Sequence, residues 1–250
     1  PEQGPIDYLR EYSYYYNTVE IDQWFWSLFK NDTVVLPKPG VVREYAASVP
    51  EDFTFCIKVP NSITLTHYYN RDKKAQLLPN RYFLSNTLFE KFIDTLQPLS
   101  AHIGPLIFQF EYLNKKKMPD KKTFFDRFHA FSQQLPGGFE YCLELRNPNY
   151  LGNDYFDLLS AANLSHVFLH GYYMESIFDF YERYRERVKD VTIIRLHSTN
   201  RQEIEKQTGN KWNTIVWPRD DDLFKLKLML EDLEERAVRS YVFVNNHFEG

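Results

Sequence analysis

Short apolar runs rich in β-branched and aromatic residues recur along the chain, and helix-like segments lie between most of them. Seven such runs are predicted strands, at residues 18–21, 53–59, 105–110, 141–146, 165–169, 191–196 and 240–245. Helix-like segments lie at residues 5–16, 84–100, 121–135, 152–162, 174–189 and 221–236. Strands that alternate with helices in this way predict parallel βαβ units, and this alternation constrains the fold more than any other feature.

This alternation favours one fold class. We expect an α/β, TIM-barrel-like (β/α) barrel that forms a single domain over residues 1–250. No GxGxxG follows a strand and no P-loop occurs, so a nucleotide-binding doubly wound sheet lacks its usual signature. A barrel of this type has eight strands, and here a helix precedes the first of the seven predicted ones. We therefore expect the first barrel strand to lie before Pro1.

Composition and charge argue against several classes of protein. Hydrophobic residues make up 43% of the chain, which allows a large core and argues against disorder. A net charge of −4 argues against a protein that coats nucleic acid with its whole surface. Cys56 and Cys142 each lie in a strand-like run, as small core residues of a reducing compartment do. No apolar stretch has membrane-spanning length and no signal peptide is present, so we expect a cytoplasmic protein without a membrane partner.

Polar residues occupy the inward positions at the ends of nearly all predicted strands. Barrel interiors are ordinarily filled by branched apolar side chains, and functional sites form at the C-terminal ends of the strands. Because an unpaired buried charge is strongly unfavourable, these residues must pair with one another or bind something polar. The inward positions carry Glu20, Lys58, Gln109, Glu144, Arg146, Arg195, His197 and Asn245.

Two interpretations of this set stay open. Glu20 and Glu144 can neutralise Lys58, Arg146 and Arg195 in a closed ion-pair network that serves only the fold. The set can instead form a ligand site at the C-terminal mouth of the barrel, which we favour for the set as a whole.

The chain also resembles a known family. The segments TVEID, FCIKVP, TLTH, LIFQF, LELRNPNY, IIRLH and VFVNN, in this order, are similar to the signature segments of the DUF72 (YecE-like) family. The resemblance extends from about Pro1 to Gly250 and implies a TIM-barrel-like fold, but little about activity, because the family's function is not established. It implies that the family's motif positions fall on Glu20, Lys58, His67, Gln109, Glu144, Arg146, Arg195, His197, Asn245 and Asn246.

The chain departs from the family pattern at several places. Asn147 stands where many members have His, Tyr150 where many have Trp, and Ser198 where many have Gly. The family's opening strand and closing helix are absent from the sequence, so we expect the protein to continue at both ends. Residues 201–220 resemble the Gram-positive branch of the family, which predicts a bacterial source.

The sequence is compatible with three functions. The first is an enzyme that acts on a small anionic or phosphorylated substrate at the C-terminal mouth of the barrel, with Glu20, Glu144 and His197 as catalytic residues. Its substrate-binding residues are Lys58, His67, Gln109, Arg146, Arg195, Asn245 and Asn246. The alternatives are a protein that binds or processes nucleic acid and a non-catalytic scaffold barrel. We expect a bound anion between Arg146 and Arg195, whereas the sequence predicts no particular cofactor.

Some further features need weighing. His67, His197 and His247 could hold a metal with Glu20 or Glu144, but no HxH or HxxxH spacing links these three histidines, so we predict no metal site. The lysine-rich run at 115–122 could attract phosphates, although such runs are more often solvated loops.

Two aromatic runs occur near the first predicted strand. Residues 24–26, Trp-Phe-Trp, are equally consistent with a stacking wall and with an apolar cap. We expect the tyrosines at 14–16 to pack against the first helix.

Overall fold

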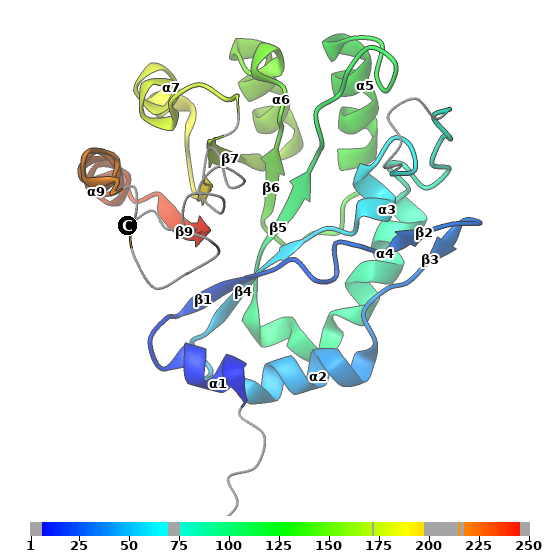
Figure 1. Cartoon of the computed structure of the whole chain (residues 1–250), viewed down its shortest axis with the longest axis horizontal. Coiled ribbons are helices and arrows are strands. Elements are labelled where there is room, and N and C mark those ends of the chain that lie inside the picture. The colour runs from blue at the N-terminus through cyan, green and yellow to red at the C-terminus, as the bar shows by residue number, and fades with distance from the viewer. Residues whose placement is uncertain (1–6, 70–75, 172, 198–214, 216–217, 246–250) are drawn as a thin grey trace, which may run out of the picture. The chain divides into compact units, whose positions relative to one another are not determined.

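The computed structural model of the chain describes residues 7–69, 76–171, 173–197, 215 and 218–245, with only the backbone of Asn245 (Figure 1). The strands are β1 (Thr18–Ile21), β2 (Leu28–Phe29), β3 (Thr33–Val34), β4 (Thr54–Lys58), β5 (Ile103–Gln109), β6 (Tyr141–Glu144), β7 (Leu164–His170), β8 (Val191–His197) and β9 (Arg239–Asn245). The α-helices are α1 (Tyr8–Ser13), α2 (Pro39–Ser48), α3 (Asn61–Thr64), α4 (Asn86–Thr95), α5 (Lys121–Ser132), α6 (Asn153–Ala162), α7 (Ile177–Tyr184) and α9 (Asp220–Glu235). The short 3-10 helices are η1 (Gln97–His102), η2 (Pro148–Tyr150) and η3 (Arg185–Arg187).

The chain divides into two compact units, Pro1–Tyr141 and Cys142–Gly250. The first unit carries β1 to β5 with α1 to α5, and the second carries β7 to β9 with α6, α7 and α9. The boundary falls at the start of β6. Whether residues 1–250 behave as a single domain stays a prediction.

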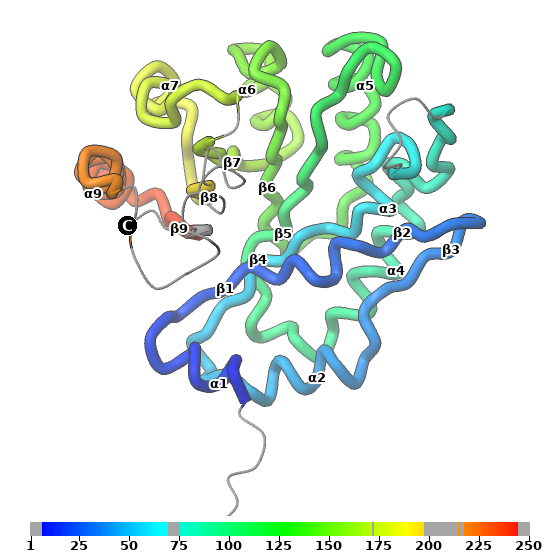
Figure 2. The backbone as a smooth tube through the Cα atoms, viewed as in Figure 1, coloured from blue at the N-terminus to red at the C-terminus, as the bar shows by residue number. Residues whose placement is uncertain are grey.

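Strand and helix alternate along the chain, as the tube in Figure 2 shows from blue to red. Hydrogen bonding orders the strands of the larger sheet as β1-β4-β5-β6-β7-β8-β9, which is their order in the sequence. All seven predicted strands are present and the fold is α/β with parallel strands, so the predicted fold class is confirmed. A strand before Pro1 would lie outside the sequence and stays a prediction.

The register of the strands determines which side chains share a face. In the first unit Glu20 pairs with Cys56 in the β1–β4 ladder, and Lys58 lies two residues further along β4. In the second unit Arg195 pairs with Phe243, and His197 with Asn245. Side chains alternate along a strand, so Glu20 and Lys58 share one face of their ladder, and Arg195 and His197 share one face of theirs.

Phenylalanine dominates the core of the first unit around β5. The rings of Phe108 and Phe128 lie 5.7 Å apart and those of Phe110 and Phe124 lie 4.9 Å apart, all fully buried. Burial of each such side chain contributes about 1.5–3 kcal/mol before entropy losses are counted. The helix that supplies two of these rings, α5, begins where the Asp120 carboxylate accepts a hydrogen bond from the backbone of Thr123.

The region between β1 and β4 differs from the sequence prediction, which assigned no helix there. Helix α2 begins at Pro39, a residue that ends helices elsewhere but is favoured at the first helical position, where its missing N–H is not needed. The hairpin β2–β3 turns through Asn31 and Asp32, both with positive φ.

The tyrosines at 14–16 also differ from the expectation that they pack against the first helix. Helix α1 ends at Ser13, and the three tyrosines that follow it are exposed, although Tyr16 stacks on Tyr12. The prediction holds for Tyr16 and was wrong for Tyr14 and Tyr15, because the helix is shorter than the run 5–16 suggested. Within the part of the chain that the structure describes, no helix combines the length and hydrophobicity needed to cross a membrane.

Candidate functional site

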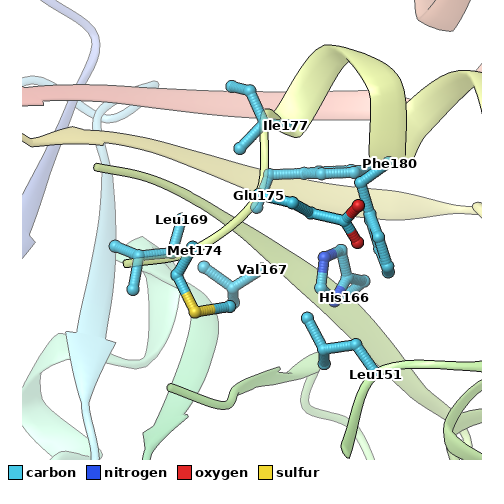
Figure 3. Close-up of a pocket in the computed structure, with 9 residues that line it drawn as sticks. Leu151, His166, Val167, Leu169, Met174, Glu175, Ile177 and Phe180 are labelled. Carbon is cyan, nitrogen blue, oxygen red and sulfur yellow. The ribbon is translucent and has the colours of Figure 1, made fainter. Parts of the chain in front are cut away.

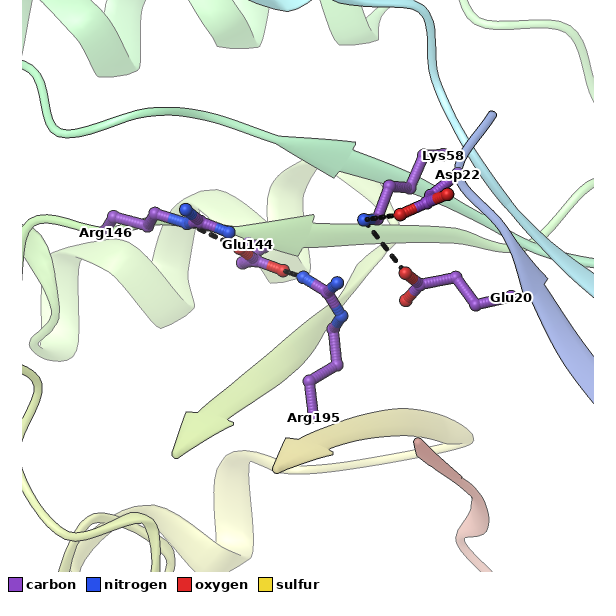
Figure 4. A network of polar contacts seen from close by, with 6 residues as sticks. All are labelled: Glu20, Asp22, Lys58, Glu144, Arg146 and Arg195. Carbon is purple, nitrogen blue, oxygen red and sulfur yellow. Dashed lines mark hydrogen bonds and ion pairs between the residues drawn. The ribbon is translucent and has the colours of Figure 1, made fainter. Parts of the chain in front are cut away.

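In the first unit a buried lysine lies between two carboxylates. The Nζ atom of Lys58 is 3.0 Å from Oε1 of Glu20 and 3.5 Å from Oδ2 of Asp22 (Figure 4). Lys58 and Glu20 are largely shielded from solvent, whereas the side chain of Asp22 is 68% exposed. We call these three residues the β1–β4 cluster. Its formal charge is −1.

Asp22 is the member of this cluster that was absent from the predicted site residues. It lies one residue past the end of β1 and two residues after Glu20, so the alternation of side chains continues through it. The spacing of two residues from Glu20 could have identified Asp22 from the sequence, but the predicted strand ended at Ile21.

In the second unit one carboxylate joins two arginines. Oε1 of Glu144 accepts a hydrogen bond of 2.9 Å from Nε of Arg146, and Oε2 accepts one from Arg195 (Figure 4). The Glu144 side chain is 0% exposed and that of Arg195 is 5% exposed, while that of Arg146 is 23% exposed. We call these residues the arginine cluster. Its formal charge is +1.

The arginines keep Glu144 ionised. Burial alone would raise the pKa of this carboxyl group, but the guanidiniums of Arg195 and Arg146 more than offset burial and hold the pKa below its ordinary value of 4.5. At neutral pH the group is therefore a carboxylate that accepts hydrogen bonds.

His197 lies two residues after Arg195 on β8 and therefore on the same face of the strand. The backbone of Gly171 lies close to the carbonyl group of His197. A Cβ atom on Gly171, which has φ +104°, would lie 2.7 Å from the carbonyl oxygen of His197. Only glycine therefore fits there without a shift. The side chain of Asn245 and all of Asn246 and His247 lie outside the described residues.

Gln109 and His67 both belong to the first unit. Gln109 is the last residue of β5 and is half-buried. His67 lies outside the main sheet, and its Nδ1 atom is 2.9 Å from Oγ1 of Thr66. Burial, followed by the charge of Lys117, lowers the pKa of His67 below its ordinary value. The structure thus brings Glu20 together with Lys58, and Glu144 together with Arg146 and Arg195.

The Trp-Phe-Trp run at residues 24–26 was predicted to form either an apolar cap or a stacking wall, and its residues differ in this respect. Trp24 and Phe25 are buried, as expected for an apolar cap, whereas Trp26 is 60% exposed, as a stacking surface requires. Phe25 lies beneath the β1–β4 cluster, with the Lys58 Nζ atom 5.9 Å from the centre of its ring.

The lysine-rich run at 115–122 carries less unbalanced charge than its sequence suggests. Lys117 pairs with Glu111, and Lys122 pairs with Asp126 one helical turn further along α5. Met118 between them is buried. These contacts fit the solvated loop and helix start that we favoured.

Metal ligands do not gather in the described part of the chain. No three His, Cys, Asp or Glu side chains there lie close enough together to hold a metal ion. The two cysteines, Cys56 and Cys142, are buried thiols.

A small pocket lies beside His166 in the second unit (Figure 3). Its walls are mainly apolar, with Leu151, Met174 and Phe180 among them. The Nδ1 atom of His166 is 2.8 Å from the hydroxyl group of Tyr155, and burial lowers the pKa of His166 to about 3. A neutral imidazole held in this way is a satisfied core histidine.

The amino-acid sequence of the chain matches a known protein family. The family model described as "Protein of unknown function DUF72" matches residues 1–250. The UPF0759 protein YecE of Escherichia coli K12 is 29% identical over 146 residues. That match covers 58% of this chain and 43% of the relative, so less than half of the relative's length is spanned.

Solved structures share the fold. A DUF72 family protein from Enterococcus faecalis V583 superposes with a TM-score of 0.66 at 15% identity, covering 96% of this chain and 82% of that one. A DUF72 family protein from Thermotoga maritima MSB8 superposes with a TM-score of 0.59 at 16% identity, covering 93% and 79%. Because the family model matches the whole chain and the fold agrees, this chain belongs to the DUF72 family.

Proposed function

We propose that this chain is an enzyme that binds a small anionic or phosphorylated substrate through the arginine cluster. One observation carries the proposal: the fully buried Glu144 carboxylate holds two guanidiniums in place, and one of them, Arg146, keeps 23% of its side chain exposed. A guanidinium oriented by a buried carboxylate has already lost its conformational freedom. It therefore binds an anion at a smaller entropic cost than a mobile surface arginine does.

The charges of the cluster support the same proposal. The cluster contains two guanidiniums and one carboxylate in a largely buried setting. A planar or tetrahedral oxyanion suits the forked geometry of a guanidinium.

The roles within the proposed site follow from the contacts. Glu144 acts as a positioning residue, because both of its oxygens accept from arginines and its low pKa leaves it no proton to donate near neutral pH. We assign proton transfer to His197, which lies on the same face of β8 as Arg195. Glu20 as a catalytic residue and Lys58 as a substrate-binding residue stay separate predictions in the first unit.

Calorimetric titration with inorganic phosphate and glycerol phosphate tests the anion site. We expect binding by the full chain, and affinity that falls by about tenfold or more in Arg146→Ala, as for a lost charge-assisted hydrogen bond. Arg183→Ala is the matched control, since Arg183 is an exposed arginine paired with Glu175. If neither anion binds, or if both variants bind like the wild type, the proposal fails.

A structural scaffold is the second candidate, and the saturation of Glu144 favours it. A buried carboxylate with both oxygens engaged can be a closed ion-pair network that serves only the fold. In that case, apolar replacement of Glu144, Arg146 and Arg195 together preserves both stability and cellular function. Retained folding with lost function would instead support a binding role.

We also propose that the protein is cytoplasmic and belongs to the Gram-positive-type branch of the family. The buried, free thiols of Cys56 and Cys142 suit a reducing compartment. Fractionation of the native host tests the compartment, and a tree of family sequences tests the branch. The stretch that suggests the branch, residues 201–220, lies largely outside the described residues.

A further inference from the structure

Trp26 and Tyr69 form an exposed aromatic pair in the first unit. Trp26 is 60% exposed and Tyr69 is 68% exposed. Their ring centres lie 6.3 Å apart and their planes meet at 71°. Two rings at this angle form a corner, in which a third ring can lie on the face of one and against the edge of the other.

The backbone on both sides of Trp26 is held by one buried residue, Asn61. The carbonyl group of Phe25 accepts a 2.7 Å hydrogen bond from the backbone N–H of Asn61. The Oδ1 atom of Asn61 accepts bonds of 2.9 Å and 3.0 Å from the backbone N–H groups of Ser27 and Leu28. Because Asn61 and Ser27 are buried, Trp26 is presented from a fixed loop, and ligand binding need not order it.

The segment that carries Tyr69 is anchored as well. The backbone N–H of the preceding residue, Tyr68, donates to the carbonyl group of Leu78 at 2.9 Å. The hydroxyl group of Tyr68 donates to the Asp32 carboxylate in the β2–β3 turn. Both exposed rings therefore belong to anchored segments rather than to loose loops.

The Phe25 ring connects this aromatic pair to the polar groups of the β1–β4 cluster. The backbone N–H of Phe25 donates to the carbonyl group of Asp22 at 3.0 Å, so a tight turn connects Asp22 to the aromatic run. The Phe25 ring lies 5.2 Å from the Trp26 ring and 5.9 Å from the Lys58 ammonium. The Phe25 ring therefore lies near both Trp26 and the ammonium of the β1–β4 cluster.

The hydrogen-bonding groups of the β1–β4 cluster favour a ligand that carries hydroxyl groups. Carboxylates accept hydrogen bonds and an ammonium donates them, and a hydroxyl group can satisfy either partner. The exposed Asp22 carboxylate repels a phosphodiester chain but not a neutral sugar. The C–H face of a pyranose ring packs flat against an aromatic ring while its hydroxyl groups stay at the rim.

We propose that Trp26 and Tyr69 form a binding site for a sugar ring, whose hydroxyl groups hydrogen bond to the exposed Asp22 carboxylate. This site lies wholly in the first unit and does not depend on the proposed anion site.

Titration of the full chain with glucose, N-acetylglucosamine, maltotriose and chitotriose tests the proposal, with saturation-transfer NMR and tryptophan fluorescence as readouts. We expect millimolar binding of at least one sugar, weakened about tenfold or more in Trp26→Ala and in Tyr69→Ala. Trp26→Phe, which keeps an aromatic face, should recover most of the affinity. Asp22→Asn should weaken binding less than loss of a ring does.

The control is Phe224→Ala, which removes an exposed ring from α9 in the second unit and should leave binding unchanged. Thermal melts of each variant establish that it is folded. If none of the four sugars binds the wild type, or Trp26→Ala binds like the wild type, the proposal is overturned. Adenosine binding that depends on Trp26, with no sugar binding, would replace the sugar with a nucleobase.

Discussion

Arg146 donates a 2.9 Å hydrogen bond from its Nε atom to Oε1 of Glu144, a carboxylate with no solvent exposure. The two residues are only two positions apart, at the end of β6 and just beyond it. The bond orients a half-buried guanidinium, and the structural and functional interpretations of the arginine cluster both depend on it.

Removing the carboxylate should destabilise the fold strongly. Glu144→Ala removes a fully buried carboxylate that pairs with the buried guanidinium of Arg195, so we expect a loss of about 3–5 kcal/mol in the free energy of unfolding. Urea denaturation measures it. Glu175→Ala, which breaks an exposed pair with Arg183, is the control and should change stability little. Equal effects of the two substitutions would contradict the buried-network account.

Arg195→Lys should weaken anion binding by about 1–3 kcal/mol, as for one charge-assisted hydrogen bond. A lysine keeps the charge but not the fork, so it cannot contact Glu144 and a ligand oxyanion with the same geometry. Calorimetry with inorganic phosphate measures the change. Affinity equal to that of the wild type would show that Arg195 does not contribute to the site.

Stability should fall with acid because of His166. Burial lowers the pKa of this imidazole from 6.5 to about 3. The unfolded chain therefore takes up the proton near pH 6.5, and the folded chain does so only near pH 3. The stabilisation from this group is complete above pH 6.5 and is lost as the pH falls between these values, by at most about 1.4 kcal/mol per pH unit.

Two variants isolate this effect. His166→Phe should flatten the dependence of unfolding free energy on pH over that window, whereas His129→Gln on α5 should not. Urea midpoints at a series of pH values provide the comparison. An unchanged slope in His166→Phe would assign the acid sensitivity to other groups, such as Glu144.

Lys58 and Glu20 should be energetically coupled. Their charged atoms lie 3.0 Å apart with both side chains largely buried, so Lys58→Met should destabilise the fold by removing a cation that pairs with Glu20. Adding Glu20→Gln should recover part of the loss. We expect a double-mutant coupling of about 0.5–3 kcal/mol. Strict additivity of the two substitutions would mean that the ion pair contributes nothing.

Gly171→Ala should destabilise the protein through strain and collision together. The glycine has φ +104°, and its new Cβ atom would lie 2.7 Å from the carbonyl oxygen of His197. Gly138→Ala is a matched control, since Gly138 has φ +85° with no atom within 4 Å of the added Cβ. We expect a larger loss of stability at Gly171, by about 1–3 kcal/mol, because overpacking adds to the strain. Equal losses would show that the backbone near His197 can move aside.

The sequence by itself determined the seven strands of the larger sheet and the face that each of their residues occupies. Glu20, Lys58, Glu144 and Arg195 could be assigned to inward positions because alternation along a strand depends only on local backbone geometry. Helix α2 was missed for an equally local reason, since Pro39 and Gly40 normally end helices.

Only the tertiary structure decided how those inward residues pair. Glu144 contacts Arg195, which is 51 residues away, and Lys58 contacts Asp22, which is 36 residues away and outside the predicted strand. It also decided that Phe25 is buried while its neighbour Trp26 is exposed. Burial and charge pairing depend on segments distant in the sequence that pack together, and no local period specifies them.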